Sequence, residues 1–272
     1  MLQIIKTEWL KIKKYPAFWW VMAITALTYP GVNFMFIYIY KDITQKENTA
    51  GKAMKALLGN PFAFPEAWHT VAYFSSLFIF IPAIVIIMLI TNEYTYKTNR
   101  QNIIDGWSRK NFMTGKMIDV LLLSVIVTAL FTIVAFVIGI TNTKQVTGNI
   151  ASMSYYIGLF ALQTFSQLSL AFMTGLLIRK SFISLAVFAF YFIILEPISS
   201  KLIQHKLHSP VYKYLPLEIS NRLIPMPEFF SKIDKAGYEA SVNAIQYHIW
   251  YTLLLIILTW VFCFWLFKKR DL

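Results

Sequence analysis

The sequence predicts an all-α integral membrane protein with six transmembrane helices. We also expect an N-terminal amphipathic helix in the membrane interface and a short cytoplasmic helix between transmembrane helices 2 and 3. Of the 272 residues, 57% are hydrophobic and 14% are charged, whereas soluble domains carry roughly 45–50% and about 25%. The mean hydropathy of +0.57 points the same way. This apolar surplus exceeds what one soluble core can bury, so lipid should solvate much of the surface.

The net charge of +12 does not indicate a nucleic-acid-binding protein. The 25 lysines and arginines are dispersed in short loops between apolar runs, not gathered on one basic domain. We therefore expect them to face lipid headgroups and to orient the chain. The single cysteine, Cys263, lies inside the last apolar run, which excludes an internal disulfide framework and a cysteine-based metal cluster.

Six charge-poor segments are long enough to cross about 30 Å of hydrocarbon as helices. They cover residues 17–40, 71–91, 118–140, 153–178, 182–200 and 246–267. The first is far longer than the ~7–15 residues of a signal-peptide core and should be retained. The fifth is interrupted by Glu196-Pro197, which predicts a short or bent helix. The whole chain, 1–272, is thus predicted to be one transmembrane domain.

The distribution of basic residues predicts that both termini are cytoplasmic. This orientation places 14 of the 25 basic residues in the shorter inside segments, as the positive-inside rule requires. The outer loops are then near 41–70, 141–152 and 201–245. The last of these contains four prolines and is expected to fold over the outer mouth.

Residues 1–16 have the pattern of an amphipathic helix. The apolar positions recur at helical spacing: Leu2, Ile5, Trp9 and Ile12. Gln3, Lys6 and Lys13 face elsewhere, so the helix can lie in the headgroup plane. Tyr15-Pro16 should end it. The alternative is a plain positive anchor at the same face.

The loop after the second span predicts a helix, a sharp turn and a second helix. The first helix would present four residues on one side: Asn99, Ile103, Ile104 and Trp107. Gly106 should terminate it, and Ser108 should cap the helix that enters the third span. Trp107 and Phe112 stand at the positions of a hydrophobic staple. Such an elbow suits docking to a soluble partner; the alternative is a solvated basic loop.

Catalytic motifs are absent from the sequence. The two Gly-Lys pairs, Gly51-Lys52 and Gly115-Lys116, lack the upstream glycine and the following Ser or Thr of a P-loop. H-E-x-x-H, C-x-x-C and G-x-S-x-G do not occur either. We therefore expect no catalytic and no metal site, and no cofactor in this chain.

Three features of the sequence are similar to one known group of membrane proteins. They are Glu8-x-x-Lys11 with Trp19 at the start of the first span, six spans in about this length, and the stretch Glu93…Thr98-x-Arg100…Ser108-Arg109-x-x-Phe112-x-x-x-Lys116. With these features the chain resembles permease subunits of ABC-2 type ATP-binding cassette transporters, in particular bacitracin and lantibiotic export or immunity permeases. The resemblance covers the whole chain in layout and about thirty residues in motif.

The resemblance implies one membrane half of a homodimer or heterodimer in the bacterial cytoplasmic membrane. Each half would bind a separate ATPase subunit, which holds ATP and Mg, through a coupling helix, here 97–106. The coupling residues would be Glu93, Lys97, Thr98, Arg100, Ile103, Ile104, Trp107, Ser108 and Arg109. Those of the interfacial helix would be Glu8, Trp9 and Lys11. Family relatives often have a shorter re-entrant segment where this chain has its broken fifth span and long outer loop.

Two further sets of residues are candidates for contact with substrate or for a structural role. The resemblance places spans two and five around a translocation cavity, where aromatics would suit an amphipathic peptide, antibiotic or lipid-like substrate. The candidates are Phe74, Phe78, Phe188 and Tyr191, with ordinary packing as the alternative. Glu196, near the outer interface, is expected to cap or pair with a residue such as Lys201 rather than couple ions.

The favoured hypothesis is an exporter subunit without enzymatic activity of its own. The alternative is a transporter or channel driven by an ion gradient, without an ATPase partner. That class favours a charged residue near the bilayer midplane and symmetry between two halves, and neither is visible in the sequence.

Overall fold

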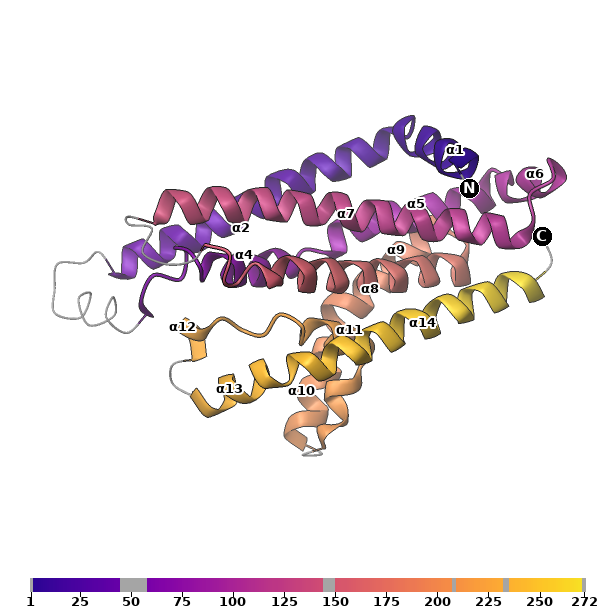
Figure 1. Ribbon diagram of the computed structural model, residues 1–272. Coiled ribbons are helices and arrows are strands. Elements are labelled where there is room, and N and C mark those ends of the chain that lie inside the picture. Colours follow the sequence, from indigo (N-terminus) through magenta and orange to yellow (C-terminus); the bar gives the residue numbers. More distant parts are fainter. Residues whose placement is uncertain (1, 45–57, 144–149, 207–208, 232–234, 271–272) are drawn as a thin grey trace.

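The computed structural model describes residues 2–44, 58–143, 150–206, 209–231 and 235–270. Every regular element in these ranges is a helix (Figure 1). The elements are α1 (Leu2–Lys13), α2 (Pro16–Thr44), α4 (Ala67–Ser76), α5 (Phe80–Thr95), α6 (Thr98–Ile104), α7 (Arg109–Asn142), α8 (Tyr155–Ile178), α9 (Ser181–Phe190), the π-helical turn η1 (Tyr191–Leu195), α10 (Glu196–Lys206), the 3₁₀ turn η2 (Pro210–Tyr214), α11 (Pro216–Asn221), α12 (Glu228–Ser231), α13 (Lys235–Asn243) and α14 (Ile245–Lys269).

The long helices confirm an all-α chain built to cross a membrane several times. Five segments are long and apolar enough to span: α2, α7, α8, α9 through α10, and α14. A sixth span results if the bent pair α4 and α5 counts as one. Many large apolar side chains on these helices are exposed, among them Trp20, Leu27, Ile133 and Leu254, and lipid is the solvent that accommodates them. The protein is a multi-pass membrane protein.

The second span, predicted over residues 71–91, is a broken helix in the structure. It consists of α4 and α5, which meet at an angle of 48° across a break at residues 77–79. Pro82 lies just after the break, and because it has no N–H, the carbonyl of Phe78 cannot make the helical bond four residues on. Phe78 instead accepts a tighter bond from the N–H of Ile81 (3.1 Å).

The fifth span also differs from the interrupted helix expected at Glu196-Pro197. Ser181–Lys206 is one helical segment of 26 residues, with Pro197 in the first turn of α10. The irregularity lies earlier, in the π-helical turn Tyr191–Leu195. A wider turn there relieves the clash between the Pro197 ring and the carbonyl of Ile193, four residues before it.

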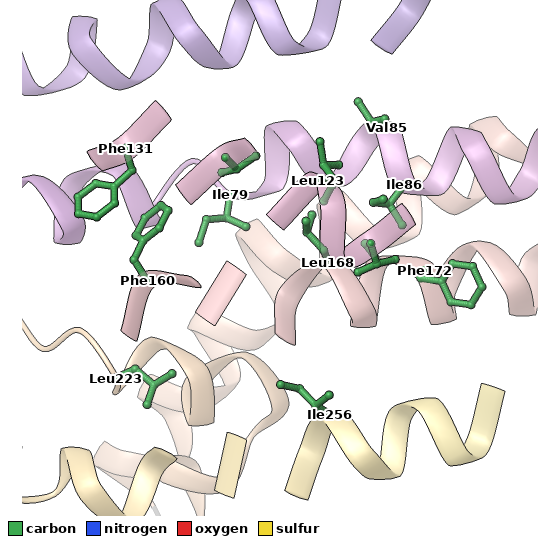
Figure 2. Packing of buried hydrophobic residues seen from close by; sticks show 14 of the residues in the cluster. Ile79, Val85, Ile86, Leu123, Phe131, Phe160, Leu168, Phe172, Leu223 and Ile256 are labelled. Atoms are coloured by element: carbon green, nitrogen blue, oxygen red, sulfur yellow. The ribbon is translucent and has the colours of Figure 1, made fainter. Parts of the chain in front are cut away.

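Helix α8 forms the centre of the bundle and packs against α5, α7 and α14. Phe160 of α8 stacks on Phe131 of α7, with ring centroids 4.3 Å apart (Figure 2). Nearer the other end of α8, Phe172 stacks on Trp260 of α14, whose indole N–H donates to the Ser169 hydroxyl (3.0 Å). A buried polar group that is hydrogen-bonded in this way avoids the desolvation penalty of an unpaired one.

Helix α8 packs tightly against α5 at Gly175. A Cβ placed there would lie 2.5 Å from Cγ2 of Ile90 and 3.5 Å from the backbone of Ile87. Small residues at such positions let helix backbones pack closely in membranes. Gly158, in the same helix, has no atom within 4 Å of its Cβ position.

We predict that Gly175→Ala lowers the stability of the bundle by about 1–3 kcal/mol, because the branched Ile90 side chain must shift to make room. The measurement is the apparent midpoint of thermal unfolding in detergent. Gly158→Ala is the matched control and should leave the midpoint unchanged or slightly raised. Equal midpoints for the two variants would contradict the close approach.

Candidate functional site

A buried group of charged residues lies where α1, α5 and α7 meet, near the end of the bundle that carries both termini (Figure 1). We call it the charged cluster: Glu8 and Lys11 of α1, Glu93 of α5, and Lys116 and Asp119 of α7. The Lys116 ammonium is 3% exposed; it lies 2.8 Å from Glu93 Oε1 and 3.3 Å from Asp119 Oδ2, and it also donates to Glu8 Oε2. Lys11 Nζ lies 3.0 Å from both Glu8 Oε1 and Glu93 Oε1.

The cluster fixes the relative position of three helices far apart in sequence. Removing charges from water is expensive, so each buried ion depends on its partners. Burial by itself raises the pKa of Glu8, but the ammonium groups of Lys116 and Lys11 outweigh it and hold that pKa below its usual 4.5. Glu8 is therefore ionised at neutral pH. The sequence motif named Glu8, Lys11, Glu93 and Lys116, and the structure brings all four together.

Asp119 is the member of the cluster that sequence reasoning missed. It stands one residue inside the predicted third span and three residues after Lys116, a spacing that places two side chains on one helix face. An ionisable residue inside an apolar span is a signal in its own right. The three-residue spacing of Lys116 and Asp119 is therefore the signal in the sequence that indicates this member of the cluster.

The elbow, residues 96–108, is attached to the charged cluster. Thr98, the first residue of α6, donates its hydroxyl to Glu93 Oε2. Lys97 before it has a left-handed backbone (φ 56°), and Gly106 after α6 has φ 96°. These two residues turn the chain sharply at either end of the short helix. On the far side, the Lys11 ammonium lies 5.9 Å from the centre of the Trp107 ring.

The turn into α7 follows the capping pattern of the sequence. Ser108 is the N-cap of α7, and its hydroxyl accepts from the N–H of Asn111 (3.1 Å). This bond satisfies one of the N–H groups that a helix start leaves without a partner. The predicted short helix over 97–106 is present as α6 over 98–104.

The elbow exposes a face different from the one expected. Asn99 is 3% exposed, and Ile103 and Trp107 pack against the apolar core, so these three point inward. Ile104, expected beside them, is 77% exposed. The exposed residues of the elbow are Tyr96, Lys97, Thr98, Arg100, Gln101, Ile104, Asp105, Gly106 and Ser108. Tyr96, which is 73% exposed, was missed, although it stands four residues before Arg100 and eight before Ile104.

Arg109 contacts the C-terminal end of the chain rather than the elbow's outer face. Its guanidinium donates to backbone carbonyls around the end of α14, at Phe267, Lys268 and Arg270. Arg270 in turn donates to the carbonyls of Leu176 (3.1 Å) and Leu177 (3.3 Å) at the end of α8. Cations bind these orphan carbonyls favourably. A role of Arg109 in coupling therefore stays a prediction, and its contacts make it a positioning group.

The interfacial residues of α1 divide between two sides. Glu8 and Lys11 enter the charged cluster, and Ile12 is 4% exposed. Trp9 is 40% exposed, so it does not share the buried side with Ile12. The side chains of Leu2 and Ile5 lie outside the described residues.

The aromatic candidates of spans two and five lie in packed contacts within the chain. Phe74 is 2% exposed, and its ring stacks on Phe36 at 3.8 Å. A chain of rings then joins the second span to the fifth: Phe78, Phe80, Phe192 and Phe188, at successive centroid distances of 6.2, 5.7 and 5.9 Å. Tyr191 is half-buried in η1. Contact of these residues with substrate stays a prediction.

Glu196, at the start of α10, contacts the backbone of the segment that follows this helix. The residue is 2% exposed, and its Oε1 accepts from the N–H of Glu218 in α11 (2.7 Å). Lys201, named above as a possible partner, is exposed. The geometry is that of a cap on a short helix, since N–H groups at a helix start need an acceptor.

The outer segment after α10 folds back into the bundle. Asn221 of α11 accepts at Oδ1 from the side-chain amides of Gln163 (3.0 Å) and Gln167 (2.8 Å) of α8. A ring nitrogen of His69 in α4 is 2.8 Å from the carbonyl of Pro225. Part of the predicted outer loop 201–245 is thus packed between transmembrane helices.

These observations define a class: a helical membrane protein whose spans are joined at one end by buried charges to an exposed elbow. The family model described as "ABC-2 family transporter protein" matches residues 4–195, which is 192 of 272 residues. The chain belongs to the ABC-2 transporter family, and this membership implies an ABC ATPase partner. A search of curated proteins found no match.

We predict that Lys116→Met strongly destabilises the end of the bundle that carries the charged cluster. Asp119 would then lose its ion-pair partner, Glu8 and Glu93 would keep only the Lys11 ammonium, and breaking a buried ion pair costs about 3–5 kcal/mol. The apparent midpoint of thermal unfolding in detergent measures the effect. Lys110→Met, on an exposed position of the same helix, is the control and should stay within about 0.5 kcal/mol of the parent. A Lys116→Met midpoint equal to this control would contradict the cluster's role.

Proposed function

We propose that this chain is the permease subunit of an ABC exporter and that its elbow is the docking site of the ATPase subunit. The observation that carries the proposal is the exposed outer face of α6, held by the charged cluster to α1, α5 and α7 at once. The chain itself makes and breaks no bonds, and ATP hydrolysis belongs to the partner. Both termini and the elbow are cytoplasmic in this proposal.

The contacts suggest how movement of the ATPase reaches the membrane. A displacement of α6 pulls on Glu93 through Thr98, and Glu93 is bound to Lys116 of α7 and Lys11 of α1. These helix ends therefore move as one unit. The bend between α4 and α5 provides a place where the inner half of span two can tilt independently of the outer half. Transport needs such discrete arrangements, with substrate affinity that differs between them.

The assembly and the cargo follow from the same proposal. The working unit contains two permease halves, identical or related, with two ATPase subunits in a bacterial cytoplasmic membrane. The cargo is an amphipathic peptide, antibiotic or lipid-like molecule. The rings that join spans two and five, from Phe78 to Phe188, support an apolar cargo, because a small shift of either span would expose aromatic surface.

Docking predicts that Arg100→Glu and Ile104→Glu each reduce ATPase co-purification by about tenfold or more. Both side chains project from the elbow, and loss of one interface hot spot costs about 2 kcal/mol. The assay is a mild-detergent pull-down of tagged protein from native membranes, quantified for the ATPase. Lys268→Glu, an exposed basic residue at the end of α14, is the charge-matched control. Normal co-purification of both elbow variants would argue against this docking site.

An ion-gradient transporter makes a different prediction at Glu196. In our proposal Glu196→Gln keeps an acceptor oxygen for the Glu218 N–H, so transport should stay within about twofold of the parent. Transport by reconstituted vesicles with ATP and the ATPase measures this. Complete loss of transport in a well-folded Glu196→Gln variant would instead favour ion coupling.

A further inference from the structure

A cavity of about 740 Å³ lies at the end of the bundle opposite the elbow. Its lining includes residues of α11, α13 and the start of α14, and Tyr73 of α4. Figure 1 shows how these four helices are arranged. Most of its lining follows residue 195, beyond the stretch that the family model matches. Its volume falls in the range of small-molecule sites, roughly 300–1,000 Å³.

Arg222 presents a hydrogen-bonding fork to this cavity. Its guanidinium stacks over the Tyr212 ring, 5.0 Å from the ring centre, and the side chain is 27% exposed. The ion pair with Glu218 engages Nε, at the base of the fork, at 3.5 Å. The two amino groups at its tip can therefore bind two oxygens of one ligand group. Arginine binds planar carboxylates and phosphates in this bidentate way.

His248 adds a second donor or acceptor to the same cavity. The residue is 5% exposed and lines the cavity wall from the first turn of α14. Its Nδ1 is buried and has no hydrogen-bond partner within the part of the chain that the structure describes. Because a buried polar atom without a partner is costly, this nitrogen is an independent sign of a missing ligand group.

The cavity lies at the depth of lipid headgroups. Tyr247 and Trp250 flank His248 on α14 and are 58% and 71% exposed. Exposed aromatics at the start of a transmembrane helix mark the membrane interface. Ala244 and His248, which line the cavity from the same turn, therefore lie near this interface.

The charge of the lining residues bears on whether the cavity favours a lipid or a free anion as its ligand. The charged residues of the lining are Arg222 and Glu218, which cancel. Without net positive charge the cavity has little attraction for a free phosphate ion in water. A phospholipid also brings acyl chains, and their contact with membrane-facing apolar side chains adds apolar burial.

We propose that this cavity binds the headgroup of a membrane phospholipid, with Arg222 holding the phosphate and His248 Nδ1 accepting a hydrogen bond from a hydroxyl of the headgroup. The aromatic rings of Tyr73, Tyr212 and Tyr238 enclose the rest of the headgroup. This inference does not depend on the proposed function. Its test needs neither ATPase nor transport.

In the experiment, dihexanoyl phosphatidylglycerol is titrated into the purified chain in maltoside detergent, and binding is measured by isothermal titration calorimetry. Dihexanoylglycerol, which lacks the phosphate, and inorganic phosphate, which lacks the acyl chains, are titrated in parallel. We expect saturable binding of the phospholipid alone. Arg222→Gln should weaken it about tenfold or more, since a charge-assisted hydrogen bond is lost. Lys201→Gln, an exposed lysine of α10, should bind like the parent.

A second variant keeps the test decisive if Arg222→Gln does not fold. Ser241→Phe fills the cavity from α13 and leaves Arg222 and His248 in place, so it should also abolish binding. Unchanged affinity in either folded variant overturns the proposal. Equal binding of dihexanoylglycerol would show a site for acyl chains only, and equal binding of inorganic phosphate would show an anion site; each result overturns the lipid-headgroup assignment.

Discussion

The arrangement at the elbow end of the bundle depends on one ammonium group, that of Lys116, surrounded by the carboxylates of Glu8, Glu93 and Asp119. A buried charge of this kind has few alternative positions, because any displacement leaves an ion desolvated and unpaired. Apolar packing in a membrane is far less selective, since lipid tails compete equally for the same surfaces. The charged cluster thus specifies how three helix ends meet where hydrophobicity alone would not.

A comparison of sequence and structure shows which features are encoded locally. The helical type of the spans could be predicted, and their number agrees with the structure if the bent pair α4 and α5 counts as one span, because about 20 apolar residues are needed to cross the bilayer wherever they pack. The roles of Ser108 as a helix cap and of Gly106 as a turn residue could also be predicted, since caps and turns depend on a few neighbouring residues. The break before Pro82 carries a local signal that hydropathy averages away.

The missed features depend on helix rotation and on distant partners. Ile103 and Ile104 are adjacent and equally apolar, and the position of α6 against α5 and α7 decides that Ile103 is covered and Ile104 is not. The sequence motif includes Glu93 and Lys116. Their pairing could not be derived from their spacing along the chain. Arg109 was assigned to the elbow by its neighbours in sequence, whereas its partners lie about 160 residues away.

The contact between Arg109 and the end of α14 has a consequence for how this protein can vary. Arg109 binds backbone carbonyls, which every residue type carries, so the identity of the side chains at 267, 268 and 270 matters little to it. The distance from the bundle to those carbonyls matters a great deal. As far as this contact is concerned, the end of α14 should therefore tolerate a substitution at exposed Lys268 but resist insertions and deletions, a constraint on length rather than on composition.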